Sequence, residues 1–317
     1  MSFPDNDEAG QGADVFAALG WDPGWEQEFS DRSGTPGRVT RVDRGVLHVL
    51  TRAGPVLAPP AADVPAVVTG DWVALNAGDL VQVSALVARR TALVRRDPGE
   101  EPAPQLLATN MDQVWIVHAV EQPLRAAWLD RALAMAHGSG ATPVVVLTKI
   151  DQVTDAGELC ERIATLAPGV ATAATSATGH HGLQPLITRL HNGRTAALLG
   201  RSGSGKSSLV NALAGAAQRT AAVRVGDARG RHTTTRRALV LTAGGSVIDT
   251  PGIRALGLWK PAKGLALTFP DIAELATHCR FDDCRHRDEP GCEVRSAVKE
   301  GRLPSDRYGR FITLSSF

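Results

Sequence analysis

The run Gly-x4-Gly-Lys-Ser at 200–207 is the stretch whose chemistry follows most directly from its residues. It comes after an apolar strand-like segment, 196–199, and opens a helical pattern that we expect to end at Gly215, which is the context of a phosphate-binding loop. Glycines let backbone N–H groups turn toward phosphates, and the helix N-terminus adds partial positive charge. The residues predicted to contact phosphates are Gly200, Arg201, Ser202, Gly203, Ser204, Gly205, Lys206, Ser207 and Ser208.

Two further positions complete a site for a nucleoside triphosphate. Lys206 is expected to reach the β- and γ-phosphates, and the Ser207 hydroxyl to ligate Mg²⁺. Asp249 begins Asp-Thr-Pro-Gly at the end of another apolar segment, 43 residues beyond Lys206, and is suited to hold the Mg²⁺ through water. The N–H of Gly252 would then sense the γ-phosphate. Asp-x-x-Gly alone is also an ordinary turn. It indicates a nucleotide site here because it follows an apolar segment at this distance from Lys206.

The base is predicted from Thr148-Lys149-Ile150-Asp151, which ends the apolar run 144–147. Guanine presents two N–H donors side by side, and the Asp151 carboxylate accepts both, whereas adenine offers no such pair. Lys149 would lay its stem along the purine, and Ser176-Ala177 would aim a backbone N–H at guanine O6. Thr148 stands where the common motif has Asn, so a looser tie to the phosphate loop is expected. Taken alone, the four residues would also fit a helix N-cap.

The segment 219–237 has six Arg and one acidic residue and contains Gly230–Thr235. Either Thr234 or Thr235 is expected to contact Mg²⁺ and the γ-phosphate. Ile253 follows Asp-x-x-Gly where many GTPases place Gln, so His232 is the candidate to act on the attacking water, with a structural role as the alternative. The Arg run predicts a mobile switch that contacts a polyanion, or else a solvated loop.

Three cysteines and a histidine form a second constellation, with the spacing Cys279-x4-Cys284-x-His286-x5-Cys292. Three thiolates and one imidazole are a tetrahedral zinc set, and all four positions are filled, so the predicted Zn²⁺ is structural. Free cysteines are the alternative, and His278 is a possible competing ligand. Cys160 stands alone and is predicted to be a small core residue.

The elements that position these residues predict a multidomain protein. Short strand-like runs punctuated by Gly and Pro indicate a small, basic, all-β barrel compatible with oligonucleotide binding. Short apolar strands alternating with helices follow from about 111 and indicate an α/β unit with a mostly parallel sheet. The predicted domains are a disordered acidic leader (1–34), an OB-like RNA-binding barrel (35–98), an α/β GTPase domain (99–262) and a mostly helical zinc-binding domain (263–317).

Composition limits the class of protein further. The 317 residues carry a net charge of only +1, but residues 1–31 hold eight acidic residues and no Lys or Arg. No apolar run is long enough to span a bilayer, and the start lacks the pattern of a signal peptide, so a cytoplasmic protein is expected, with nothing to suggest more than a monomer.

In an ordinary GTPase the phosphate loop precedes the base reader, and here the order is reversed. This circularly permuted order, with Gly70–Val73 and the run Cys279–Cys292, resembles the RsgA (YjeQ) family, roughly over residues 35–300. The resemblance implies an N-terminal barrel, a permuted GTPase and a zinc domain. It also implies late maturation of the small ribosomal subunit, rRNA contacts, subunit-stimulated GTP hydrolysis and a catalytic role for His232. The acidic leader departs from the family pattern.

The leading hypothesis is therefore a GTP-hydrolysing assembly factor that docks on rRNA with GTP bound and is released after hydrolysis. An RNA-binding assembly chaperone, whose nucleotide only sets its conformation, is the alternative. An ATP-driven nucleic-acid enzyme is a third reading, which Asp151 argues against.

Overall fold

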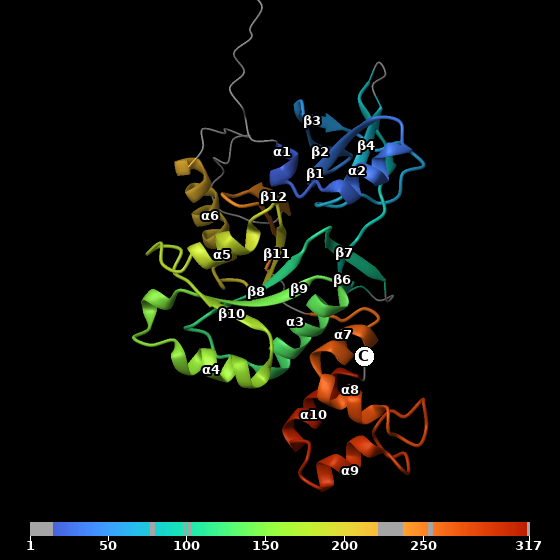
Figure 1. The fold of residues 1–317 in the computed structure, drawn as a ribbon, viewed down its shortest axis with the longest axis vertical. Helices are drawn as coiled ribbons and strands as arrows, with labels where there is room; N and C mark the ends of the chain where they lie inside the picture. Colours follow the sequence, from blue (N-terminus) through green and yellow to red (C-terminus); the bar gives the residue numbers. More distant parts are fainter. Residues whose placement is uncertain are drawn as a thin grey trace, which may run out of the picture.

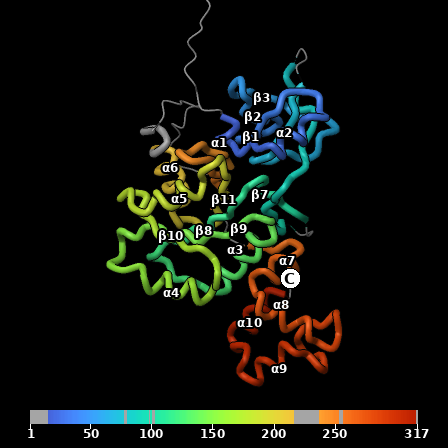
Figure 2. Tube along the Cα trace, viewed as in Figure 1, coloured from blue at the N-terminus to red at the C-terminus, as the bar shows by residue number. Residues whose placement is uncertain are grey.

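A computed structural model describes residues 15–76, 80–97, 99, 103–220, 237–252 and 256–315, with the backbone alone for 216–220. The chain forms three units in a row, a β barrel, a central α/β unit and a helical C-terminal unit (Figure 1). The three units follow one another along the chain, and the third comes after α7 (Ala262–Thr268) and begins with α8 (Pro270–Ala276) (Figure 2). The predicted fold class is confirmed.

The barrel consists of β1 (Thr35–Asp43), β2 (Val46–Thr51), β3 (Gly54–Ala58), β4 (Trp72–Asn76) and β5 (Gln82–Leu86). The strand order is β3-β2-β1-β4-β5, and a parallel bridge between Pro60 and Val83 closes the circle from the end of β3 to β5. This is the strand order of an oligonucleotide-binding barrel. Alternating inward residues fill it: Val39, Leu47, Val49, Ala58, Val73, Leu75 and Val83.

The leader was predicted to be disordered over residues 1–34, but residues 15–34 contain two helices that pack on the barrel. Helices α1 (Val15–Ala18) and α2 (Pro23–Ser30) bring Phe16 and Trp25 against Trp72 at the start of β4, with ring centroids 5.3 and 5.9 Å from it. Asp22 caps α2 by accepting from the Trp25 N–H at 2.9 Å. The prediction was wrong here because the acidic count outweighed the aromatic residues, which supply enough apolar area to order the segment. Residues 1–14 lie outside the described part of the chain.

The central sheet has the order β10-β9-β8-β11-β13-β12. Its strands are β8 (Gln113–Ala119), β9 (Thr142–Thr148), β10 (Ala171–Ala174), β11 (Thr195–Gly200), β12 (Ala238–Leu241) and β13 (Ser246–Asp249). All neighbours are parallel except β12 and β13. At its edge β12 pairs with β1 through Arg41 and Ala238, which joins this sheet to the barrel.

Helices cover both faces of this sheet, as its continuous apolar strands predict. Alternate residues of β8 and β9 face α3 (Ala126–Gly138) and α4 (Gly157–Leu166) on one side. The intervening residues face α5 (Gln184–Leu190) and α6 (Lys206–Thr220) on the other. A 3-10 turn, Ile150–Gln152, follows β9. Helix α6 continues past Gly215, so the predicted C-cap there was wrong.

A two-stranded hairpin, β6 (Ala92–Arg96) and β7 (Pro104–Thr109), stands between barrel and central unit. It belongs with the central unit, since the Ala92 N–H donates to the Ser139 carbonyl at the end of α3 (3.1 Å). The predicted boundary at 98/99 falls inside this hairpin. The barrel therefore ends near Leu86, earlier than predicted.

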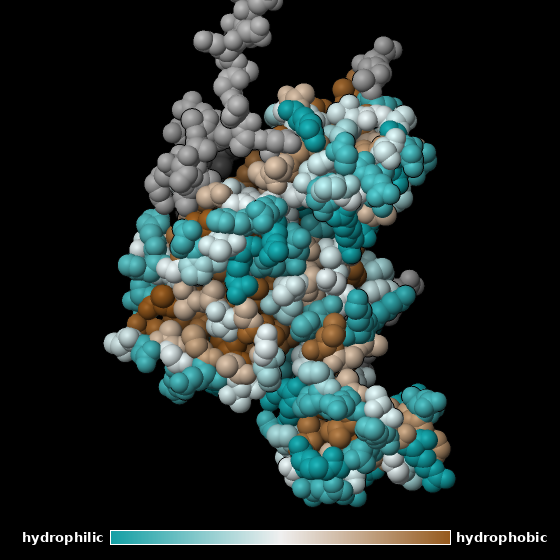
Figure 3. All heavy atoms as spheres, viewed as in Figure 1, coloured by the Kyte–Doolittle hydropathy of each residue, from teal (hydrophilic) through white to brown (hydrophobic). Residues whose placement is uncertain are grey.

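The C-terminal unit is built from α8, α9 (Glu293–Lys299) and α10 (Ser305–Leu314), and its few buried apolar residues belong to the same core cluster as those under α3. On the face shown in Figure 3, hydrophilic residues cover most of this unit and of the barrel, and apolar residues gather over the central unit. Within the described residues, no helix combines the length and apolarity needed to cross a membrane.

A buried ion pair ties the C-terminal unit to the central one. Arg310 of α10 places Nε 2.8 Å from the Asp130 carboxylate of α3, and the Asp130 side chain is fully buried. Burial raises the pKa of Asp130 to about 6, against the opposing attraction of Arg310. Protonation of Asp130 therefore favours the folded state, and that contribution is lost as pH rises through about 6.

We expect the Asp130→Asn variant to lose this pH dependence. Between pH 5 and pH 7.5 the wild-type free energy of unfolding should fall by about 1 kcal/mol more than that of the variant. Urea denaturation at the two pH values measures the difference. Equal changes in both proteins would contradict the assignment, whatever the absolute cost of leaving Arg310 without its anion.

Candidate guanine-nucleotide site and metal cluster

The predicted phosphate loop lies at the C-terminal end of β11, between β8 and β13, where doubly wound sheets bind ligands. Gly203 and Gly205 have φ angles of 79° and 86°, which glycine adopts without strain. At Gly200 a Cβ atom would lie 2.5 Å from the Val117 carbonyl oxygen, so only glycine fits. The loop runs directly into α6 at Lys206, as the motif requires.

Lys206, Ser207 and Asp249 meet at this end of the sheet. Lys206 donates from Nζ to the carbonyls of Gly200 and Arg201, both at 2.9 Å, so its ammonium group lies over the loop. The Ser207 hydroxyl donates to Asp249 Oδ2 at 3.1 Å. Burial lowers the pKa of Lys206 and raises that of Asp249, and each group opposes the other's shift.

The donor set here fits Mg²⁺. Asp249 Oδ1 is buried and accepts no hydrogen bond from the part of the chain that the structure describes. A carboxylate oxygen beside a hydroxyl is the hard-oxygen environment that Mg²⁺ prefers. Next along the chain, Thr250 donates to the Leu198 carbonyl, and a Cβ on Gly252 would lie 3.0 Å from Ser202 N. The Asp-Thr-Pro-Gly backbone thus touches the phosphate loop.

Although Thr is shorter than the Asn of the common motif, the Thr148 side chain still contacts the phosphate loop. Its hydroxyl donates to the Ser204 carbonyl at 2.7 Å and lies 3.4 Å from the His118 carbonyl. The end of β9 is therefore tied to the phosphate loop by Thr in place of Asn.

The predicted base-reading residues also come together. Lys149 has a φ of 60°, and Asp151 follows it in the exposed 3-10 turn. Hydrogen bonds from the Ser176 side chain, and less from Thr178, lower the pKa of Asp151. The turn that holds Ser176 and Ala177 is closed by reciprocal backbone bonds between Ser176 and His181 at 3.0 and 3.1 Å. Asp151 thus stays ionised beside the segment predicted to face guanine O6.

Some predicted residues lie outside the described part of the chain. These are His232, Thr234, Thr235 and the neighbouring Ile253. Their predicted roles stay predictions.

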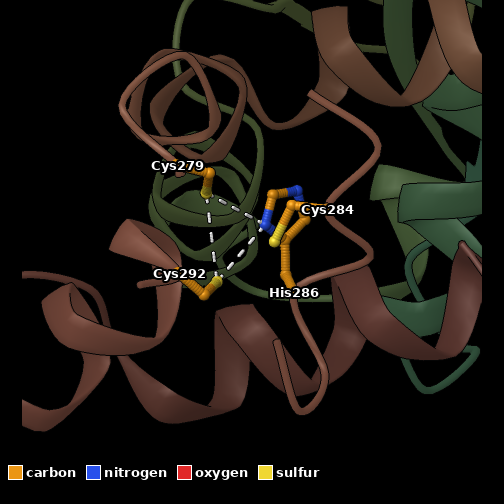
Figure 4. Close-up of side chains that lie close together, drawn as sticks. All are labelled: Cys279, Cys284, His286 and Cys292. Atoms are coloured by element: carbon orange, nitrogen blue, oxygen red, sulfur yellow. Dashed lines mark hydrogen bonds between the residues drawn. The ribbon is translucent and has the colours of Figure 1, made fainter. Parts of the chain in front are cut away.

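The residues Cys279, Cys284, His286 and Cys292 form one cluster (Figure 4). Their ligand atoms all lie within 4.8 Å of one another. His286 Nδ1 is 3.5 Å from the sulfurs of Cys279 and Cys292, which are 4.0 Å apart. His278 is not among the clustered residues. Four donors this close suit one metal ion.

Neighbouring side chains fix the loop that presents the ligands. The Glu289 carboxylate accepts from the backbone N–H groups of Arg285, Arg287 and Asp288 at 2.8 to 3.1 Å. Hydrogen bonds from its own backbone N–H and from these three hold its pKa at about 2. Tyr308 of α10 donates to the His286 carbonyl at 2.6 Å. His286 itself has a φ of 61°, so the loop is held in a conformation that needs such support.

No sequence motif marks the turn that follows β8. Glu121 pairs with the ammonium group of Lys149, and Gln122 lies beside the phosphate loop. Only their position, directly after a buried strand of the central sheet, could have marked them.

The fold and site define a class, the circularly permuted phosphate-loop GTPases. The phosphate-loop strand β11 sits in the middle of the sheet but follows β8 to β10 along the chain, so the base reader precedes it. The RsgA GTPase family model matches residues 86–259. The chain belongs to the RsgA GTPase family, and it is accordingly a GTP-hydrolysing enzyme.

Individual relatives agree with the family. The chain is 43% identical over 307 residues to the small ribosomal subunit biogenesis GTPase RsgA of Streptomyces coelicolor, covering 92% of this chain and 84% of the relative. With the Streptomyces avermitilis protein of the same name it shares 44% over 306 residues, or 92% and 82% of the two chains.

Two solved structures resemble the whole fold. YloQ, a circularly permuted GTPase, superposes with a TM-score of 0.62 at 25% identity and covers 90% of this chain and 96% of its own. YjeQ from Thermotoga maritima has a TM-score of 0.66 at 24% identity, covering 89% and 97%. The second likeness concerns the fold alone.

Proposed function

We propose that this protein is a GTPase of late small ribosomal subunit maturation. It binds GTP with Mg²⁺, contacts rRNA, hydrolyses GTP when the subunit stimulates it, and is then released. The observation that carries the proposal is the hydrogen bond from the Thr148 hydroxyl to the Ser204 carbonyl, which ties the base-reading motif to the phosphate loop, in a chain whose relatives are named for this process. We also propose that the protein works in the cytoplasm and as a monomer.

In this proposal Asp151 and Lys149 bind guanine, and Ser176 and Ala177 line the base. The loop 200–208 and Gly252 bind the phosphates. Ser207 and Asp249, with Thr234 or Thr235, hold Mg²⁺, which neutralises developing phosphate charge when it is bound. His232 acts on the attacking water.

We further propose that the cluster of three cysteines and His286 holds structural zinc. Tetrahedral zinc with usual bond lengths separates sulfur from nitrogen by about 3.6 Å and two sulfurs by about 3.8 Å. The 3.5 and 4.0 Å distances here support that ion. All four donors come from the protein, so no position is left for a catalytic water.

The rRNA contact is proposed from charge and position. Residues 32–317 carry a net charge of +9, because the eight acidic residues and no Lys or Arg of 1–31 leave that remainder from +1. The barrel shares a sheet edge with β12, which follows the Arg-rich segment. A chain with this excess of positive charge outside its first 31 residues should bind polyanions in a salt-dependent manner.

GTP turnover of the purified protein tests the proposal. We expect strong stimulation by small ribosomal subunits and none by large subunits. His232→Ala should reduce the stimulated rate by about 10²-fold or more, as expected for loss of a general base. His191→Ala is the matched control, since His191 lies at the end of α5.

Other outcomes would identify the competing hypotheses. If His232→Ala abolished hydrolysis but left release from the subunit unchanged, the protein would act as an assembly chaperone. If ATP competed with GTP at equal concentration, the guanine assignment would fail.

A further inference from the structure

We infer that Glu121 is a positioning residue of the guanine site, which holds Lys149 in place for the purine ring and thereby sets nucleotide affinity. The inference deepens the proposed function, because it rests on the assignment of Lys149 and Asp151 to the base. Nothing in the base-reading or phosphate-binding motifs marks Glu121.

The backbone that carries Glu121 is anchored on both sides. The Val120 N–H donates to the Thr148 carbonyl at 3.1 Å, and the Gln122 N–H donates to the Ala119 carbonyl at 2.9 Å. The turn is therefore hydrogen-bonded both to the end of β8 and to the base-reading motif, since β8 and β9 are neighbours in the sheet (Figure 1).

His118 adds a third anchor below the turn. Its Nε2 lies 3.1 Å from the Gln122 carbonyl, and its side chain is buried. Burial lowers the pKa of His118, so the ring is neutral at physiological pH and donates from Nε2 to that carbonyl. The position of Glu121 is thus set by the fold and not by the ion pair alone.

From this turn Glu121 reaches Lys149 and forms an ion pair with its ammonium group. The two side chains are partly exposed, at 37% and 30%. Beside it, Gln122 places Nε2 3.7 Å from the position of a Cβ on Gly203. One short turn therefore contacts both the base-reading motif and the phosphate loop.

The ion pair restricts a flexible side chain before the nucleotide arrives. A free Lys carries about 2 kcal/mol of rotamer entropy, and part of it would be lost when the stem lies along the purine. Because Glu121 already holds the ammonium group of Lys149, less rotamer entropy is lost when the nucleotide binds. A partly exposed pair contributes about 0.2–1 kcal/mol, so its removal should weaken binding by about 1.4- to 5-fold.

The test is a double-mutant cycle on nucleotide affinity. We expect Glu121→Gln to raise the Kd of GDP and of GTP by the same factor, about 1.4- to 5-fold, measured by calorimetry at low salt. In a Lys149→Met background the same substitution should have no effect, because the residue through which it acts is absent. Glu161→Gln, an exposed Glu of α4, is the matched control and should leave both Kd values unchanged.

The preference for GTP over inosine triphosphate separates this role from base reading. Inosine lacks the 2-amino group that donates a hydrogen bond to Asp151, so the ratio of the two affinities reports on Asp151. Because Glu121 acts through Lys149, Glu121→Gln should leave this ratio unchanged. An equal loss in the Lys149→Met background, a changed ratio or no loss at all would overturn the inference. If the wild-type protein bound no guanine nucleotide, the proposed function would fail with it, whereas unchanged binding by Glu121→Gln would overturn the inference alone.

Discussion

Replacement of Asp151 with Asn is expected to reduce GTP affinity by about 10²- to 10⁴-fold. The carboxylate is ionised in the folded protein, because hydrogen bonds from Ser176 lower its pKa. It would accept two charge-assisted bonds from guanine N1–H and N2–H₂, worth about 1.5–3 kcal/mol each. An Asn amide offers one acceptor and one donor to the same edge, so one of these bonds is lost and the other loses its charge.

The same substitution should improve binding of xanthosine triphosphate. Xanthine carries a carbonyl at position 2 in place of the amino group, and the Asn NH₂ donates to it. Competition of GTP, xanthosine triphosphate and ATP against labelled GDP measures the change, with Asp155→Asn, in the loop before α4, as the control. Unaltered discrimination in Asp151→Asn would show that Asp151 does not read the base.

The geometry of the phosphate loop and of the cysteine–histidine cluster was predictable because each lies within a short stretch of sequence. Gly200 to Ser207 form one turn between a strand and a helix, so their types and spacing nearly determine their geometry. Likewise Cys279 to Cys292 span fourteen residues, and the cluster distances follow from that short loop. The parallel sheet was predictable from apolar runs buried on both faces.

Features that depend on contacts far apart in the chain were not predictable. Glu121 is an ordinary surface Glu until the sheet sets β8 beside β9 and brings Lys149 to it. The same holds for the packing of Phe16 and Trp25 against Trp72, which begins β4 more than 45 residues later. The Asp130 and Arg310 pair, 180 residues apart, has no local sequence signal.

Loss of the metal cluster is the other large effect that we expect, on folding and not on catalysis. Structural zinc contributes about 10–16 kcal/mol to the folding of small domains. The C-terminal unit after α7 contributes few buried apolar residues, and units of about 40 residues rarely fold without metal or disulfides. We therefore expect Cys292→Ser, at the buried cysteine of the cluster, to unfold the region from about 270 onward.

Limited proteolysis and metal analysis of the purified chain measure this effect. Cys292→Ser should lose about one equivalent of zinc, become cleavable between 270 and 315, and still bind GDP, because the central sheet keeps its own core on both faces. Cys160→Ser should keep the metal and resist cleavage, since Cys160 lies in α4, outside the cluster. Wild-type protein that contained no metal, or a Cys292→Ser variant as resistant as wild type, would show that the four side chains pack together without an ion and that hydrogen bonds such as those of Glu289 and Tyr308 are enough to hold the loop between α8 and α9.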